Sequence, residues 1–201
     1  NKGEIIVARV GLQEGFDHLD VVELRENGAY AVVSGLKSGV ADAPWAELPS
    51  EISEDQARPW MLPTVFDHVR AGKSDMLSEL RPVAALFLKF GGLDYDQDPE
   101  AALRLDAFFT WVGKVINTHG GSVIQVTVGD KGSYLYIAFG APLSRSDDAV
   151  RATLAAMELS MPPAEFDGIT DLQIGLACGQ MRVGAYGGAA QRTYGAIGDK
   201  T

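Results

Sequence analysis

The order of strand-like and helix-like segments after Arg81 is the feature that most constrains this fold. The apolar run Val83–Phe90 has the length of a strand, and apolar residues then recur at helical spacing from Asp98-Pro99 to His119-Gly120-Gly121. The later pattern predicts strands over Val123–Val128 and Ser133–Phe139, a helix over Ser146–Leu159, and strands over Leu172–Cys178, Met181–Ala185 and Thr193–Ile197. This β-α-β-β-α-β order predicts an α+β, ferredoxin-like fold, an antiparallel sheet with helices on one face.

Side-chain spacing within these segments predicts which residues face the core. On the second helix, Val150, Leu154 and Met157 lie at helical spacing and are expected to point inward. Tyr134 and Tyr136 alternate along a strand, so we expect them on one face of the sheet. Cys178 lies in an apolar strand and is expected to be a buried small residue rather than a nucleophile.

The residues before Arg81 follow a different pattern. Glu4–Val10 and Ala29–Val33 are strand-like, and Glu26-Asn27-Gly28 is typical of a turn. The following stretch is acidic and interrupted by prolines, with short helices expected over Pro63–Ala71 and Lys73–Leu80. We therefore expect a strand pair over residues 1–35, an inter-domain linker over 36–80, and the main domain over 81–201.

The net charge limits the ligands and partners. The 17 lysines and arginines against 27 aspartates and glutamates leave a formal charge of −10. Because such a surface repels phosphates, we expect no nucleic-acid partner and no membrane binding, and an anionic ligand needs a bridging metal ion. No apolar run approaches the ~20 residues of a membrane span. The single cysteine excludes an intramolecular disulfide and a cysteine-built zinc site, and together these features indicate a cytoplasmic protein.

One strand is similar to a nucleic-acid-binding signature. Lys131–Phe139 approaches the strand motif of RNA-recognition domains, which share the β-α-β-β-α-β order. Ser133 shifts the aromatic residues by one place relative to the basic residue, and the acidic charge opposes RNA. An RNA-binding domain is therefore a remote alternative.

Three blocks of sequence carry a stronger resemblance. Val123–Pro142 has a strand, a Gly-Asp turn and a strand ending in Phe-Gly; Asp147–Ala152 begins the next helix; Leu172–Asp199 is glycine-rich and ends in Tyr-Gly-Ala-Ile-Gly-Asp. In this order the blocks resemble the catalytic domains of class III adenylyl and guanylyl cyclases. The Phe-Gly-Ala-Pro and Asp-Lys-Gly phrases resemble the second catalytic half of the soluble, bicarbonate-sensitive cyclases. The resemblance covers residues 81–201.

The resemblance implies a function for a pair of domains. In this family two such domains associate head to tail and hold ATP or GTP in the cleft between them. Two Mg²⁺ or Mn²⁺ ions, bound by aspartates of one half, bridge the phosphates. The ribose 3′-hydroxyl attacks the α-phosphorus, and pyrophosphate leaves. A second cyclase domain, in the same chain or another, is therefore the expected partner.

The metal positions of the family are only partly kept. Phe87–Leu93 matches the family phrase F-x-D-I-x-G-F, but Lys89 stands where the first metal aspartate is expected. An ammonium group cannot ligate a divalent metal, although it can contact a phosphate. Asp130 matches the second metal aspartate, and a plain turn role for it is the alternative. We therefore expect the metal ions to be held mainly by a partner domain.

The base-selecting and catalytic positions are less complete. The first base-selecting position falls at Gln125 and Val126, and the second at Gly195 and Ala196. Gln125 offers a donor and an acceptor to a purine edge, whereas Gly195 has no side chain, so the choice between ATP and GTP is left open. The family's transition-state asparagine and arginine are expected beyond Thr201, so this chain alone is expected to be inactive.

Two functions follow from the resemblance. The first is the second, C2-like half of a two-domain nucleotide cyclase. The second is a catalytically inactive, cyclase-like module that regulates by dimerisation or by sensing a small ligand. Gly3-Glu4-Ile5-Ile6-Val7-Ala8 resembles the closing strands of a cyclase domain, so residues 1–35 are interpreted as the end of a preceding one.

Overall fold

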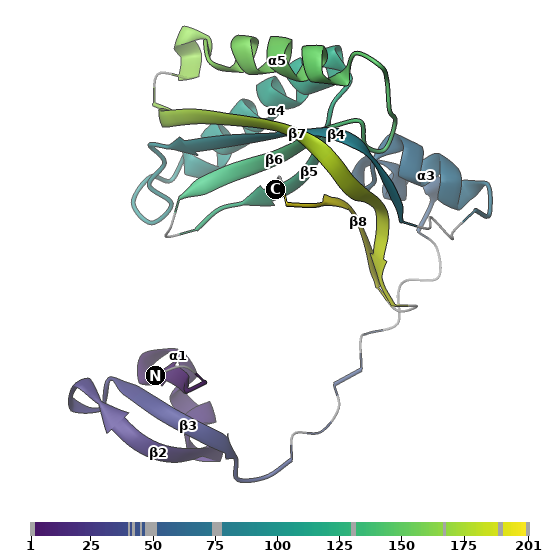
Figure 1. Cartoon of the computed structure of the whole chain (residues 1–201). Helices are drawn as coiled ribbons and strands as arrows, with labels where there is room; N and C mark the ends of the chain where they lie inside the picture. Colours follow the sequence, from purple (N-terminus) through teal and green to yellow (C-terminus); the bar gives the residue numbers. More distant parts are fainter. Residues whose placement is uncertain are drawn as a thin grey trace. The chain divides into compact units, whose positions relative to one another are not determined.

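The computed structural model describes most of the chain as two compact units. The described residues are 3–39, 41, 43–44, 46, 52–73, 78–129, 132–166, 168–188 and 191–199. The units are Asn1–Glu51 and Ile52–Thr201, and each is described by itself (Figure 1). Asp130 lies outside the described residues.

The N-terminal unit is a small antiparallel sheet with strand order β1-β3-β2. Its elements are β1 (Ile5–Ala8), α1 (Arg9–Leu12), η1 (Gln13–His18), β2 (Leu19–Arg25), η2 (Glu26–Gly28) and β3 (Tyr30–Leu36). The predicted pairing of the first and last strands is present, but the prediction missed β2, whose sequence LDVVELR does not alternate cleanly. The guanidinium of Arg25, at the end of β2, pairs with the carboxylate of Glu4, just before β1, at 3.0 Å and so links the two outer strands of this sheet.

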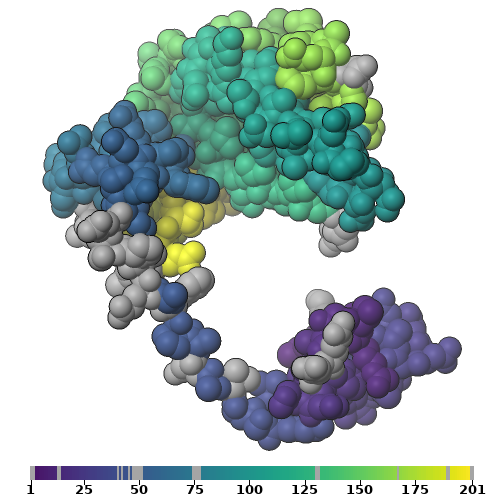
Figure 2. Space-filling model, turned by 180° about the vertical axis from the view of Figure 1, so that it is seen from behind, coloured from purple at the N-terminus to yellow at the C-terminus, as the bar shows by residue number. Residues whose placement is uncertain are grey.

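Short helices open the C-terminal unit. They are α2 (Glu54–Ala57), η3 (Arg58–Trp60) and α3 (Pro63–Arg70), and the space-filling view shows this blue segment against the rest of the unit (Figure 2). Ser53 caps α2, since its hydroxyl accepts from the Gln56 N–H while the Gln56 side chain accepts from the Ser53 N–H. The helix predicted over Lys73–Leu80 is wrong at its end, because Glu79 and Leu80 already belong to a strand.

The main sheet confirms the predicted ferredoxin-like order. Its elements are β4 (Glu79–Gly91), α4 (Ala101–His119), β5 (Ser122–Thr127), β6 (Ser133–Phe139), α5 (Asp148–Leu159), η4 (Ala164–Phe166), β7 (Thr170–Gly187) and β8 (Arg192–Ile197). The strands are antiparallel in the order β5-β6-β4-β7-β8. Helices α4 and α5 lie on one face, and β8 lies toward the other (Figure 1).

Strand β7 is longer than the sequence pattern predicts. Two strands were expected over Leu172–Cys178 and Met181–Ala185, but β7 runs through Gly179 without a break. The reason is its partner: β4 pairs with β7 without a break from Glu79 to Lys89 and so supplies a continuous ladder of backbone hydrogen bonds past Gly179. A glycine weakens a strand but does not end one that has such a partner.

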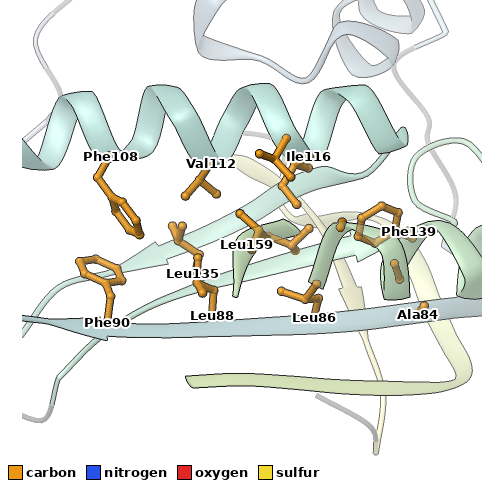
Figure 3. Packing of buried hydrophobic residues seen from close by; sticks show 14 of the residues in the cluster. Ala84, Leu86, Leu88, Phe90, Phe108, Val112, Ile116, Leu135, Phe139 and Leu159 are labelled. Atoms are coloured by element: carbon orange, nitrogen blue, oxygen red, sulfur yellow. The ribbon is translucent and has the colours of Figure 1, made fainter. Parts of the chain in front are cut away.

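The core lies between the sheet and the two helices. Alternate residues of β4 point into it, and Figure 3 shows them meeting side chains of α4, α5 and β6. Its fully buried members include Leu86, Leu88, Phe90, Phe108, Val112, Ile116, Leu135, Phe139 and Leu159. Each such side chain contributes about 1.5–3 kcal/mol by its burial. Gly120 ends α4 in the left-handed conformation, with φ of 78°, as a C-terminal glycine cap does.

The predicted inward face of α5 is wrong. Ala152, Ala155 and Leu159 are buried, whereas Val150, Leu154 and Met157 are 61%, 48% and 59% exposed. Because α5 is apolar on several sides, its periodicity does not define one face. Small alanines allow a closer approach to the core than larger side chains would, which explains the observed orientation.

Cys178 is also placed differently from the prediction. It is exposed, and it lines an open cavity of about 350 Å³ beside the start of α5. Its backbone pairs with the buried Ala84 of the helix-side core, but α5 does not cover this position. Among the described helices, none has both the length and the apolar character needed to cross a membrane.

Candidate active site

The sheet face opposite the two helices carries a second cluster of buried side chains. Residues of β4 that alternate with the core residues point to this open face, and β6, β7 and β8 contribute the rest. The buried members are Val83, Ala85, Tyr136, Ala138, Ala141, Met181, Val183 and Ala196, with Phe87, Ile124 and Tyr194 packed against them. This face therefore has its own apolar floor.

Lys89 lies in a groove on the open face. The groove has a volume of about 470 Å³ and is lined by Phe87, Lys89, Gly132, Tyr134, Gln173, Ile174 and Gly175. In the sheet, Lys89 is paired with Tyr134 on one side and with Gln173 on the other, and its side chain is exposed. A cation therefore stands between a phenol and an amide, a combination that suits an anionic ligand.

An aromatic platform borders Lys89. The rings of Phe87 and Tyr136 stack with centroids 4.9 Å apart and planes at 8°, and the Tyr134 ring lies 6.3 Å from that of Phe87. The prediction that Tyr134 and Tyr136 share one face is consistent with these contacts. Burial, with a smaller contribution from Tyr186, raises the pKa of Tyr136 to about 12. The Tyr136 hydroxyl is therefore a hydrogen-bond donor at neutral pH.

Tyr136 connects β6 to β8 across the open face. Its hydroxyl donates to the carbonyl oxygen of Ala196 at 2.7 Å. On the other side of β6, Tyr136 is paired in the sheet with Gln125 of β5. The two predicted base-selecting segments are therefore both in contact with one buried tyrosine.

The predicted base-selecting residues differ in their exposure and in the face of the sheet on which they lie. Gln125 is exposed, and its amide donates to the Thr127 hydroxyl at 3.2 Å. Val126 is 47% exposed but is paired with Leu135 of the helix-side core, so it is directed away from the open face. Gly195 and Ala196 are both buried in β8. Their contribution to a ligand site is therefore through the backbone.

The described residues do not form a metal site. Lys89 occupies the position of the first expected metal aspartate, and an ammonium group has no lone pair for a cation. Across the described part of the chain, no three histidines, cysteines, aspartates or glutamates are grouped so as to hold an ion. The donor set therefore does not fit a divalent cation, and Asp130 lies outside the described residues.

The motifs did not single out every residue of this face. Phe87 was noted only as part of the family phrase around Lys89, and Gln173 only as part of a strand. Tyr136 had the alternation that places it beside Tyr134, but its bond to Ala196 spans 60 positions in the sequence. A contact between such distant residues has no local pattern, so only the fold identifies it.

Comparison with known sequences shows which proteins this chain is similar to. No family model matches the chain. Human adenylate cyclase type 10 is 28% identical over 125 residues, and the rat protein of that name is 26% identical over the same length. The match covers 62% of this chain but only 8% of either relative.

Solved structures agree with this similarity. The guanylyl cyclase Cya2 is 27% identical, with a TM-score of 0.51, and the match covers 62% of this chain and 68% of Cya2. The adenylyl cyclase CyaB of P. aeruginosa has the same TM-score at 20% identity, which shows the shared fold. The fold and the sequence therefore support the resemblance to class III cyclase catalytic domains that the motifs predicted. One individual protein that this chain resembles in sequence is adenylate cyclase type 10.

Proposed function

We propose that this chain is the C2-like half of a two-domain nucleotide cyclase. The pair would convert ATP or GTP into the 3′,5′-cyclic nucleotide and pyrophosphate. The observation that carries the proposal is the open-face groove, where the cation Lys89 lies beside the aromatic side chains of Phe87 and Tyr134 in a cyclase-type domain. This arrangement offers charge to phosphates and aromatic side chains to a base.

The chain's own residues would bind and orient the nucleotide. Lys89 would contact a phosphate oxygen, and Gln125 would donate to and accept from the edge of the purine. In the reaction, a bond forms between the ribose 3′-oxygen and the α-phosphorus as the bond to pyrophosphate breaks. Holding the 3′-oxygen in line with the breaking bond between the α-phosphorus and pyrophosphate is the main contribution that binding residues make to such a transfer.

Metal binding is assigned to the partner domain. The described residues lack a suitable donor set, and Lys89 replaces one of the two expected carboxylates. We assign Mg²⁺ or Mn²⁺ to aspartates of a second cyclase domain, in the same chain or in another. With a cyclase domain as the partner, residues 1–35 are interpreted as the end of a preceding cyclase domain and residues 36–80 as a linker. The single cysteine agrees with a cytoplasmic protein.

The test is reconstitution with a partner. The chain, in its natural sequence context, is combined with a cyclase domain that carries both metal aspartates, and cyclic nucleotide is measured with ATP or GTP and Mg²⁺ or Mn²⁺. We expect product from the pair and none from these 201 residues alone. A pair that associates but neither binds nor converts either nucleotide would refute the proposal.

Lys89 gives a sharper test within the pair. Replacing it by methionine keeps the length of the side chain but removes the charge, so we expect nucleotide affinity to fall about tenfold, the loss typical of one charge-assisted contact. Lys114→Met on α4 makes the same change in net charge on an exposed helix position and is expected to leave the affinity unchanged. Equal affinities for the two variants would contradict a role for Lys89.

A regulatory module is the second candidate. It is favoured by the presence of Lys89 in place of the family's first metal aspartate and by the absence of a side chain at Gly195. In that case the chain would bind a cyclase domain and change its activity without contacting nucleotide. The reconstituted pair distinguishes the two, because Lys89→Met would then leave nucleotide affinity unchanged while the pair still forms.

A further inference from the structure

Strand β8 lies at one edge of the main sheet. It is the last strand in the order β5-β6-β4-β7-β8 and pairs along its length with β7, from Arg192 to Ile197. An edge strand has one row of backbone groups that no neighbouring strand satisfies. Its position over the open face therefore depends on its pairing with β7 and on side-chain contacts from other strands.

One such contact is the hydrogen bond between Tyr136 and Ala196. At 2.7 Å it is short, and both residues are buried, with exposed fractions of 6% and 2%. The hydroxyl also lies 3.8 Å from the sulfur of Met181 on β7, a second and weaker acceptor, so the short bond to Ala196 is the main one. A buried hydroxyl without a partner is costly, so this geometry favours one position of β8.

Tyr136 is itself held firmly. Its ring stacks on Phe87 of β4, and its backbone is paired in the sheet with Phe87 on one side and Gln125 on the other. A side chain fixed in this way transmits the position of β5 and β6 to β8. Gln125 and Ala196 belong to the two segments that the cyclase resemblance assigns to base selection.

From this geometry we infer that Tyr136 is a positioning residue for base recognition, which holds the Gly195–Ala196 backbone at a defined place relative to Gln125 through its hydroxyl. The inference rests on the proposed function. Because Gly195 has no side chain and Ala196 has only a methyl group, a base that reaches this segment would meet the β8 backbone. Its fit then depends on where β8 is held.

The test removes the hydroxyl alone. Tyr136→Phe keeps the ring on Phe87 but loses the bond to Ala196. In the reconstituted pair we expect KM for the preferred nucleotide to rise about fivefold with kcat nearly unchanged, and the ratio of kcat/KM for ATP and GTP to shift. Hydrogen exchange of the β8 amides, measured without nucleotide, is expected to become faster.

A matched control separates positioning from general stability. The Tyr186 hydroxyl donates to the Arg182 carbonyl at 2.7 Å, so Tyr186→Phe also loses one tyrosine-to-carbonyl bond, but within β7. We expect it to leave the ATP-to-GTP ratio and the β8 exchange rates unchanged. A general loss of stability alone would change the ATP-to-GTP ratio and the β8 exchange rates equally in both variants.

The outcomes distinguish the inference from the proposed function. If the wild-type pair is active and Tyr136→Phe matches Tyr186→Phe in KM and in base preference, the inference is wrong and the function stands. If the wild-type pair neither binds nor converts nucleotide, the function fails, and base positioning by Tyr136 fails with it. A selective rise in KM with faster exchange in β8 supports both.

Discussion

At the scale of single residues, two tyrosines of the open face respond to burial in the same way. Burial raises the pKa of Tyr136 to about 12, and burial with Tyr186 nearby raises that of Tyr194 to about 12, against an opposing effect of Arg81. The ordinary value is 10. Between pH 10 and about pH 12, the two tyrosine hydroxyls keep their protons in the folded protein and lose them in the unfolded chain. The folded state is therefore favoured below pH 10 and loses this advantage as the pH rises.

This titration predicts how stability depends on pH. The free energy of unfolding is expected to fall as the pH rises from about 10 through about 12, with about 1–2 kcal/mol from Tyr136 after allowance for solvent screening. Urea unfolding at several pH values measures it. Tyr136→Phe is expected to lose about 1 kcal/mol at pH 7 and to show a shallower alkaline decline. Equal slopes for variant and wild type would contradict a buried, protonated Tyr136.

A second prediction concerns a glycine at the end of β4. Gly92 has φ of +88°, and an added Cβ would lie 2.9 Å from the Thr170 nitrogen and collide with the Gly168 carbonyl. We expect Gly92→Ala to cost about 2 kcal/mol or more. Gly113 lies within α4 with no atom near its added Cβ, so Gly113→Ala is expected to stabilise by roughly 0.5–1 kcal/mol. Thermal unfolding of both variants measures the difference, and the opposite order would refute this packing.

At the scale of elements, α5 shows how packing selects among possible faces. The helix has apolar residues on more than one side, and the core takes up the side that carries Ala152 and Ala155. The larger side chains of Val150, Leu154 and Met157 remain exposed. Close contact between a helix and a sheet favours small residues, and this consideration outweighs the greater hydrophobicity of leucine and methionine.

The orientation of α5 can be tested by two substitutions at adjacent positions. Leu154→Gln changes an exposed residue and is expected to alter the free energy of unfolding by less than about 0.5 kcal/mol. Ala155→Leu adds volume at a site with no exposed surface and is expected to cost about 1–3 kcal/mol. Denaturant unfolding at neutral pH compares them. A larger loss from Leu154→Gln than from Ala155→Leu would show that α5 faces the other way.

At the scale of the whole molecule, the chain consists of two compact units with separate buried residues. Both clusters of the C-terminal unit are built from residues between Val83 and Ala196. The N-terminal unit buries Ala31, Val32 and Val33 in its own small sheet. A three-stranded sheet of this kind has little core of its own, so the C-terminal unit is the main source of stability.

This division predicts the result of a truncation. Residues 52–201 expressed alone are expected to keep a cooperative unfolding transition, with a melting temperature within about 2 °C of the intact chain's main transition. Circular dichroism during heating measures it, and residues 1–51 serve as the complementary fragment. A C-terminal fragment without a cooperative transition would show that its core depends on the N-terminal residues.

Local patterns in the sequence were sufficient for the types and order of the main elements. Alternation and helical spacing after Arg81 predicted the ferredoxin-like order, because each depends only on neighbouring residues. The motifs likewise identified the cyclase-type domain and the lysine at position 89. In the N-terminal unit the same reasoning missed β2, whose pattern is irregular and whose identity as a strand depends on pairing with β3.

Only the tertiary structure decided which surfaces meet. The continuity of β7 through Gly179 depends on the ladder that β4 supplies, and the exposure of Cys178 depends on where α5 begins. The bond from Tyr136 to Ala196, which brings the two predicted base-selecting segments against one side chain, depends on the return of β8 over the open face. These contacts join residues far apart in the sequence, so they follow from the packing of complete elements, which a local pattern does not contain.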